Sequence, residues 1–369
     1  MIGEGGHGSE LQAVDAKKPL ARLGIRAVVL VWDAPGGTHR SEHLGQHLGA
    51  DVRHVYITRK KGWLVAPFKY CCQAIMTLVL ISRNRYRLVF VQNPPVFAAL
   101  SVYVYSLFAR ACFVIDSHTE ALLAPVWQWT LPLHRFLSRR AIATMTTNDH
   151  LQQMIASWGA PAFVLRDVPS TSPKRKQVHL LDAVMNVAVV SSASHDEPTD
   201  QVLEAARTLP DVAFFVTGNY HTRSLQSTVE RAPANVHFTG YMPDEEYYGL
   251  LEVVQVVICL TTEDHTHQSG ASEALWLGKP IITSDWPLLR RYFDKGTIHI
   301  DNTAESIRQA VLTIVSNLPV YEAEIRELRE ERQHEWLEKA QALMRLVEQA
   351  MPWCFRDQSS PVQEELPLL

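Results

Sequence analysis

The segment CLTTEDHTHQSGASEALWLGKPIITSDWP, residues 259–287, decides the fold class. It reads as an apolar strand that ends at Leu260, a polar loop, and a helix over about 270–277. Gly278 and Pro280 follow as stop signals. In an open α/β sheet, ligands bind beyond the carboxyl ends of the strands. A loop of small residues that leads into a helix there offers free N–H groups and a positive dipole end, which suit a pyrophosphate.

Strand-like and helical patterns alternate on both sides of this segment. Repeats of strand, helix and strand indicate a parallel sheet with helices on both faces. The apolar runs lie at 27–32, 52–57, 88–93, 112–118 and 141–148 in the first half, and at 185–192, 213–219, 236–241, 254–260, 280–285 and 297–301 in the second. Because 369 residues exceed one ordinary core, we expect an α/β protein with two doubly wound domains.

The domain boundaries follow from composition. A linker is expected where prolines, serines and three cations interrupt the apolar pattern in PSTSPKRKQ. We expect a flexible leader over 1–22, a first domain over 23–168, the linker over 169–184, a second domain over 185–340, and a C-terminal helix end and tail over 341–369.

The overall composition is that of an ordinary globular protein, with 47% hydrophobic and 20% charged residues. The formal charge of -4 gives the whole chain no attraction to nucleic acid, so no nucleic-acid partner is expected. The five cysteines form no CxxC pair, which favours a reduced, cytoplasmic compartment. The N-terminal stretch lacks the apolar core of a secretory signal.

One apolar stretch, residues 63–81, is long enough to test as a membrane span. A proline, a lysine and a glutamine interrupt it and argue against insertion. It can instead be a partly buried helix, or a helix that also touches a membrane surface. The preceding RKK run at 59–61 is either a solvated edge or part of the same contact. A peripheral contact through 59–81 would place a cytoplasmic protein at the inner face of the membrane.

Glu273 stands in the first turns of the helix expected after the polar loop. Its carboxylate could accept hydrogen bonds from ribose hydroxyls. It could equally be a first-turn carboxylate that the helix dipole favours, a contribution of about 0.3–1 kcal/mol. The residues alone leave both interpretations open.

Histidines at two places invite a metal interpretation. A histidine recurs at every fourth position from His39 to His47, and Asp264, His265 and His267 form a D-H-x-H group. The first set has no partner cluster that the sequence identifies. The second set can instead contact a donor sugar or lie in a solvated loop, so no metal site is expected.

The segment at 259–287 resembles the donor-site motif of the retaining GT-B glycosyltransferases, the glycosyltransferase group 1 family. In that family a loop and helix carry two glutamates eight positions apart, followed by Ala, then Gly, a further residue and Pro. This chain is in step at Glu273, Ala274, Gly278 and Pro280, and the first glutamate falls on His265. The resemblance implies the GT-B fold, in which two Rossmann-like domains face a central cleft.

The resemblance covers about residues 25–340. FFVTGN, VHFTGYMPDEEYYGLL and SDWPLLRRYF are similar to consecutive elements of the family's donor domain. VFVQNPP is similar to the chitobiosyldiphosphodolichol β-mannosyltransferases, an inverting relative, so the stereochemical outcome stays open. IDSHT matches the family's position for a cleft histidine, here His118, and Gly36 and Gly37 match its glycine loop.

The resemblance implies a set of site residues. The catalytic residues would be His118, His265 and Glu273. The donor-binding residues would be Gly36, Gly37, Gly218, Tyr241, Gln268, Ser269, Gly270, Ala271 and Glu273. No cofactor and no metal are implied, because helix dipoles and N–H groups can stabilise a leaving diphosphate.

The family often carries an Arg and a Lys after the first strand of the donor domain. This chain has SSASHDEPTD there, residues 191–200, without a cation. Phosphate charge would then be met by backbone N–H groups, by Arg290 or Arg291, or by a residue of the first domain.

The predicted function is transfer of a sugar from a nucleotide diphosphate sugar to a glycan or lipid-linked acceptor, in glycolipid or polysaccharide assembly. Two alternatives remain. A nucleotide-sugar 2-epimerase has the same two-domain architecture and needs acid-base groups around one sugar. A non-catalytic nucleotide-sugar-binding protein would explain His265 and the missing cations.

Overall fold

The computed structural model describes residues 19–22, 24–35, 39–58, 62, 65–166, 175–178, 180, 183–220 and 226–352. The chain divides into two compact units. The first comprises Met1–Val168 together with Leu337–Leu369, and the second comprises Pro169–Trp336.

The first unit is built on a parallel sheet. Its strands are β1 (Ala27–Val31), β2 (Asp51–His54), β3 (Leu88–Asn93), β4 (Cys112–Ser117), β5 (Thr144–Thr146) and β6 (Ala162–Val164). They lie in the order β2-β1-β3-β4-β5-β6, and every pairing is parallel. The residues of β1 and β3 are buried throughout, as expected for strands covered on both faces. The order reverses between β1 and β3, as in flavodoxin-like sheets.

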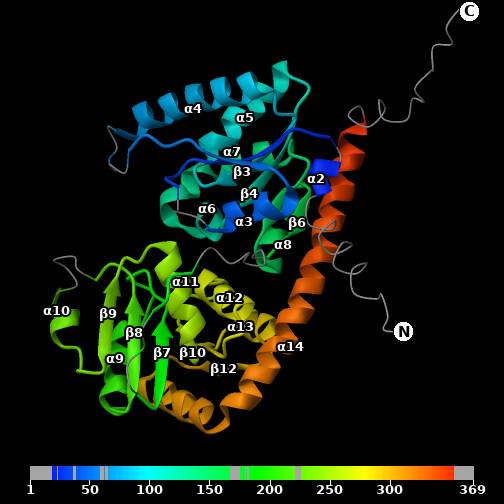
Figure 1. The fold of residues 1–369 in the computed structure, drawn as a ribbon. Coiled ribbons are helices and arrows are strands. Elements are labelled where there is room, and N and C mark those ends of the chain that lie inside the picture. Colours follow the sequence, from blue (N-terminus) through cyan, green and yellow to red (C-terminus); the bar gives the residue numbers. More distant parts are fainter. Residues whose placement is uncertain are drawn as a thin grey trace, which may run out of the picture. The chain divides into compact units, whose positions relative to one another are not determined.

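Helices cover both faces of this sheet (Figure 1). The elements are α2 (Pro19–Arg22), α3 (His39–Leu48), α4 (Val65–Asn84), α5 (Val96–Phe108), α6 (Thr119–Leu123), the 3-10 helix η1 (Pro125–Thr130), α7 (Leu131–Ser138) and α8 (Asp149–Ser157). One face is covered by α4, α5 and α7, which share a core with the strands. The other face receives α3, where a Cβ on Gly45 would lie only 2.3 Å from Val52 Cγ2.

The second unit has a parallel sheet of a different order. Its strands are β7 (Met185–Val189), β8 (Val212–Thr217), β9 (Val236–Gly240), β10 (Val256–Cys259), β11 (Ile281–Ser284) and β12 (Thr297–Ile300). The order β12-β11-β10-β7-β8-β9 is that of the Rossmann fold, with its reversal between β7 and β10. The predicted pair of doubly wound α/β domains is confirmed.

Two cores flank the second sheet. The helices are α9 (Thr199–Arg207), α10 (Gln226–Glu230), α11 (Asp244–Val253), α12 (Ser269–Trp276), α13 (Pro287–Tyr292) and α14 (Ala304–Ala350). On one face α11, α12 and α13 pack through residues such as Leu250, Ala271 and Leu289. On the other face α9 and the start of α14 pack through residues such as Leu203 and Ile307.

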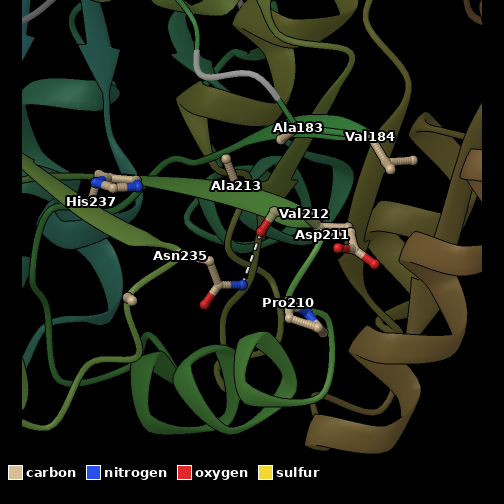
Figure 2. A pocket seen from close by; sticks show the side chains of 9 residues that line it. Ala183, Val184, Pro210, Asp211, Val212, Ala213, Asn235 and His237 are labelled. Atoms are coloured by element: carbon tan, nitrogen blue, oxygen red, sulfur yellow. Dashed lines mark hydrogen bonds between the residues drawn. The ribbon is translucent and has the colours of Figure 1, made fainter.

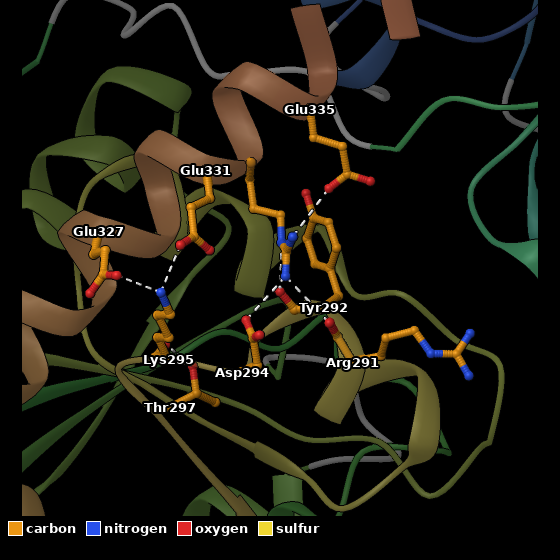
Figure 3. A network of polar contacts seen from close by, with 9 residues as sticks. Arg291, Tyr292, Asp294, Lys295, Thr297, Glu327, Glu331 and Glu335 are labelled. Carbon is orange, nitrogen blue, oxygen red and sulfur yellow. Dashed lines mark hydrogen bonds and ion pairs between the residues drawn. The ribbon is translucent and has the colours of Figure 1, made fainter. Parts of the chain in front are cut away.

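The long helix α14 is tied to the second unit by a polar network (Figure 3). Lys295 Nζ donates to Glu327 at 2.6 Å and to Glu331 at 2.7 Å. Gly296 has a φ of 61°, and a Cβ there would lie 2.5 Å from the Ile325 backbone nitrogen. The helix is interrupted at Asn317, two positions before Pro319, which is the usual cause of such a break.

Helix α4 keeps much of its apolar surface in solvent. Only Gln73, Thr77 and Ile81 are buried, whereas Phe68 is 72% exposed. The other large exposed apolar side chains of the helix are Ile75, Met76 and Val79. Within the described part of the chain, α4 is also the helix that is long and apolar enough to cross a membrane.

Candidate functional site

Helix α12 begins where the second sheet reverses its strand order. The chain leaves β10 at Cys259, passes through the loop 260–268 and enters the helix at Ser269. Gln268 precedes the helix with an extended backbone, and its side-chain amide donates to the Leu260 carbonyl at 2.7 Å. The helix expected over 270–277 is therefore found almost where the sequence placed it.

Gly270 allows α12 to lie close to the sheet. A Cβ at this position would be 2.4 Å from Val190 Cγ1 and 2.9 Å from Cys259 Sγ. Gly270 and Ala271 are buried, Ser269 is exposed, and the Ala271 backbone is hydrogen-bonded to the Cys259 thiol. Packing thus accounts for the glycine, in the way that one glycine of dinucleotide-binding turns serves close helix–strand contact.

Glu273 is a buried carboxylate, 7% exposed, on this helix. Tyr247 donates its hydroxyl to one carboxylate oxygen, and Tyr248 donates to the other at 3.3 Å. Burial, and then the charge of Glu273, raise the pKa of Tyr247 well above its ordinary value. The pair of tyrosines on α11 fixes the carboxylate, and sequence reasoning missed them although they stand in the quoted YY dipeptide.

His267 anchors the loop before α12 to an aromatic cluster. Its Nε2 lies 2.7 Å from Ser272 Oγ, and its ring stacks on Phe293 with a centroid distance of 5.4 Å. Tyr292 meets the same ring edge-on at 4.7 Å. Arg332 of α14 donates to the Tyr292 carbonyl at 3.0 Å. His267 is therefore a packing residue of the loop.

His265 has a left-handed backbone, with a φ of 61°. Its N–H donates to Asp264 Oδ1 at 2.6 Å, and its Nε2 lies 3.5 Å from Asp264 Oδ2. The side chain is 41% exposed. The imidazole therefore lies partly exposed beside the Asp264 carboxylate.

The described residues contain no cluster of three or more His, Cys, Asp or Glu side chains that could hold a metal ion. His43 and His47 are buried on α3.

The loop after β7 is closed by Glu197. The backbone N–H groups of Ser192 and Ser194 donate to its carboxylate at 3.0 and 3.1 Å. Gly218 follows β8 with a φ of 102°, and a Cβ there would lie 2.6 Å from the Ser191 carbonyl oxygen. Gly218 therefore lets the two loops meet. Glu197 was missed, because only the folded loop brings its carboxylate back to the serines.

Asp196 links the loop after β7 to the loop after β10. Its carboxylate accepts from Thr261 Oγ1 at 2.8 Å, and its carbonyl accepts from the Thr262 N–H at 2.8 Å. Burial alone would raise the pKa of Asp196, but hydrogen bonds from Ser194 and Thr261 lower it below its ordinary value. The two loops at the reversal of the sheet are thus held as one surface.

Arg290, one of the two arginines that the sequence offered for a diphosphate, pairs with a carboxylate. Arg290 forms an ion pair with Asp285, the residue after β11, with Nη2 at 2.6 Å from Oδ2. The Arg291 carbonyl accepts a hydrogen bond from Arg332 at 3.3 Å.

In the first unit, His118 stands beside a buried ion pair. Arg40 of α3 contacts Asp116 of β4 with both Nε and Nη2, at 3.1 and 3.0 Å. His118 Nε2 lies 3.6 Å from Asp116 Oδ2, and the His118 side chain is 26% exposed. Burial would raise the pKa of Asp116, but Arg40 and His118 hold it well below its usual range. Sequence reasoning named His118 and missed the pair that supports it.

A second histidine lies behind this group. His134 of α7 is fully buried, with the Asn93 amide 3.2 Å from its Nε2 and Ser117 Oγ at 3.5 Å. Burial lowers the pKa of His134 to about 4. The imidazole is therefore neutral at physiological pH and serves the packing of the strand ends.

Comparison with known proteins identifies the fold of this chain. No protein-family model and no curated protein sequence matches the chain. Among solved structures, HepE of Anabaena in complex with UDP and glucose matches with a TM-score of 0.62, 13% identity and coverage of 87% of this chain and 99% of its own. Sucrose-phosphate synthase of Thermosynechococcus elongatus matches with a TM-score of 0.68, 12% identity and coverage of 89% and 100%. The chain has the GT-B fold.

A further GT-B neighbour belongs to another reaction class. A putative UDP-N-acetylglucosamine 2-epimerase from Listeria monocytogenes matches with a TM-score of 0.60, 12% identity and coverage of 82% of this chain and 91% of its own. The GT-B fold is thus common to transferases and epimerases, and the residues of the site must decide between them.

Most of the predicted site residues lie at the carboxyl edge of the second GT-B sheet. The residues that follow β8 or β10 are Gly218, His265, Gln268, Ser269, Gly270, Ala271 and Glu273. Tyr241 follows β9 and is 75% exposed. Gly36 and Gly37 lie outside the described residues. The RKK run at 59–61 also lies outside them.

A pocket of about 760 Å³ opens at the opposite edge of the same sheet (Figure 2). Its walls come from the amino ends of β7, β8 and β9 and include Val184, Asp211 and His237. The Asn235 side-chain amide donates a hydrogen bond to the Val212 carbonyl at 2.9 Å. This edge is not where open α/β sheets bind ligands, so we do not assign the donor to it.

Proposed function

We propose that this protein is a glycosyltransferase that transfers a sugar from a nucleoside diphosphate sugar. One observation carries the proposal. In the second domain of a GT-B fold, the helix that leaves the switch-point strand carries a buried carboxylate, Glu273, held by two tyrosines. A fixed carboxylate at the carboxyl edge of the sheet can accept hydrogen bonds from ribose hydroxyls.

A uridine diphosphate sugar is the first donor to test, because HepE is described in complex with UDP and with UDP-glucose. In the proposed complex, Glu273 binds the ribose and the exposed start of α12 faces the diphosphate. His265, held by Asp264, contacts the donor sugar. The dipole of α12 stabilises the leaving group without a metal.

His118 is the proposed proton-handling residue of the first domain. The Asp116 carboxylate lies 3.6 Å from its Nε2 and can hold the imidazole in a fixed orientation. His118 can therefore accept a proton from an acceptor hydroxyl as the new glycosidic bond forms. Arg40 keeps Asp116 in place for this task.

The acceptor is proposed to be a glycan or a lipid-linked molecule. The exposed apolar side chains of α4 support docking of a cytoplasmic protein on a membrane that holds such a lipid. Lys69 and Arg83 on the same helix would add attraction to anionic lipid.

A nucleotide-sugar 2-epimerase is the second candidate, favoured by the match to the Listeria protein. Incubation of UDP-glucose and UDP-N-acetylglucosamine with the protein and no acceptor separates the two. A transferase should release UDP slowly through transfer to water and form no epimer. Accumulation of the 2-epimer, seen by NMR, would favour the second candidate.

A further inference from the structure

The loop after β7 holds a carboxylate in a cradle of donors. Besides the N–H groups of Ser192 and Ser194, the hydroxyls of Ser191 and Ser192 donate to Glu197 at 2.5 and 3.1 Å. Ala193, between the two N–H donors, has a left-handed backbone with a φ of 61°. Successive N–H groups around such a residue form a nest that binds anions.

This nest lies where a ligand of an α/β domain is expected. It follows β7, one of the two strands between which the order of the second sheet reverses. The stretch 191–200 contains no lysine or arginine. The serine N–H and hydroxyl groups are therefore the groups of this loop that bind an anion. In the structure they donate to the Glu197 carboxylate.

We propose that Glu197 is an internal competitor for a phosphate group of the donor, an inference that rests on the proposed function. One set of N–H groups cannot serve the carboxylate and a phosphate at once, and two anions at that spacing repel each other. A diphosphate that enters the nest displaces Glu197. The apparent affinity for phosphate-bearing ligands is then reduced by the fraction of molecules whose nest is free.

Displacement of Glu197 would also affect the neighbouring loop, residues 260–268. The adjacent residue, Asp196, holds Thr261 and Thr262 through its carboxylate and its carbonyl. Those threonines begin the loop that carries His265. A phosphate in the nest is therefore coupled to the position of the residue proposed to contact the donor sugar. Glu197 acts as a specificity-determining residue, because it weakens binding of phosphate and not of the nucleoside.

The test is calorimetric titration of pyrophosphate, UDP and uridine into the parent protein and two variants. Glu197→Gln keeps the shape of the side chain and removes its charge, which weakens its hold on the nest. Glu263→Gln is the matched control, because it removes the same charge from an exposed carboxylate of the neighbouring loop. We expect E197Q to bind pyrophosphate and UDP about ten-fold more tightly than the parent, with uridine unchanged.

Glu197→Asp gives a second, independent measurement, because it keeps the charge and shortens its reach. It should show a smaller gain of the same sign. Unchanged or weaker binding of pyrophosphate by both E197Q and E197D would overturn the proposal, and so would an equal gain in E263Q. If pyrophosphate binding gains as expected while UDP binds no variant, the inference stands and the nucleotide donor of the proposed function fails.

Discussion

The buried imidazole of His134 gives the first domain a pH-dependent stability. Its pKa in the folded protein is about 4, because burial disfavours the charged form, whereas an exposed histidine titrates near ~6.5. Between these values the unfolded chain binds a proton that the folded chain does not. The contribution of the neutral His134 to the free energy of unfolding is therefore fully present above pH ~6.5. It falls as pH decreases toward 4, by on the order of 3 kcal/mol.

Urea unfolding of the parent and of His134→Gln between pH 7 and pH 4.5 measures this effect. Gln can still accept from the Asn93 amide and does not titrate, so the variant should lose much of the pH slope. Asp116 stays ionised across this range, because Arg40 holds its pKa low. Equal slopes in the two proteins would show that His134 is not the titrating group.

Substitution of His265 tests whether contact with the donor sugar can be separated from nucleotide binding. His265→Ala should reduce sugar transfer at least ten-fold and leave the dissociation constant of UDP nearly unchanged, because the proposed contact is to sugar and not to phosphate. His265→Glu, which places a glutamate where the retaining GT-B motif that this segment resembles has one, should keep or raise transfer. Transfer rates of both variants equal to that of the parent would make His265 a bystander.

Helix α12 is the element that carries the candidate site, and its position depends on the absence of a side chain at Gly270. Gly270→Ala places a Cβ 2.4 Å from Val190 Cγ1, so the helix or the side chains that face it must shift. We expect a loss of about 1–3 kcal/mol in stability, and weaker UDP binding because Glu273 moves with the helix. Ser269→Ala, on the exposed start of the same helix, should change the melting temperature little. A Gly270→Ala protein as stable as the parent would contradict this packing.

The helices and strands of the candidate site could be predicted from the sequence. The side-chain contacts between them could not. The 259–287 segment predicts a strand, a loop and a helix with Glu273 on it, because each is a local pattern of apolar and small residues. Tyr247 reaches Glu273 from another helix, and Arg332 reaches Tyr292 from 40 residues away. Glu197 reads as an ordinary loop carboxylate until the loop closes on it. These contacts depend on how helices pack, which periodicity does not encode.

At the scale of the whole chain, the alternation of strands and helices predicts two doubly wound sheets but not their strand orders. The first sheet has a flavodoxin-like order and the second the Rossmann order, although both halves show the same repeat. The difference lies in the side of the sheet to which each crossover returns. The side to which a crossover returns depends on the whole fold and not on a local pattern. The assignment of Leu337–Leu369 to the first unit likewise depends on the whole fold.

Vesicle sedimentation tests the proposed docking of α4 on a membrane surface. Binding should rise with the content of anionic lipid and fall with salt, because exposed charges are screened within about 10 Å at 0.1 M. The double substitution Ile75→Ser with Val79→Ser should weaken it further, since both side chains are exposed and their loss leaves the core intact. Negligible sedimentation with neutral and anionic vesicles alike would favour a soluble acceptor.

We propose that the second domain binds a nucleoside diphosphate sugar through Glu273. Calorimetric titration of UDP-glucose into the parent and into Glu273→Gln tests it most directly, with melting curves to show that both proteins are folded. We expect the parent to bind and the variant to lose about 1.5–3 kcal/mol of binding free energy, because the charged acceptor for the ribose hydroxyls is gone. A parent that binds no nucleotide sugar of uridine, guanosine or adenosine, or a variant that binds as tightly as the parent, would contradict it.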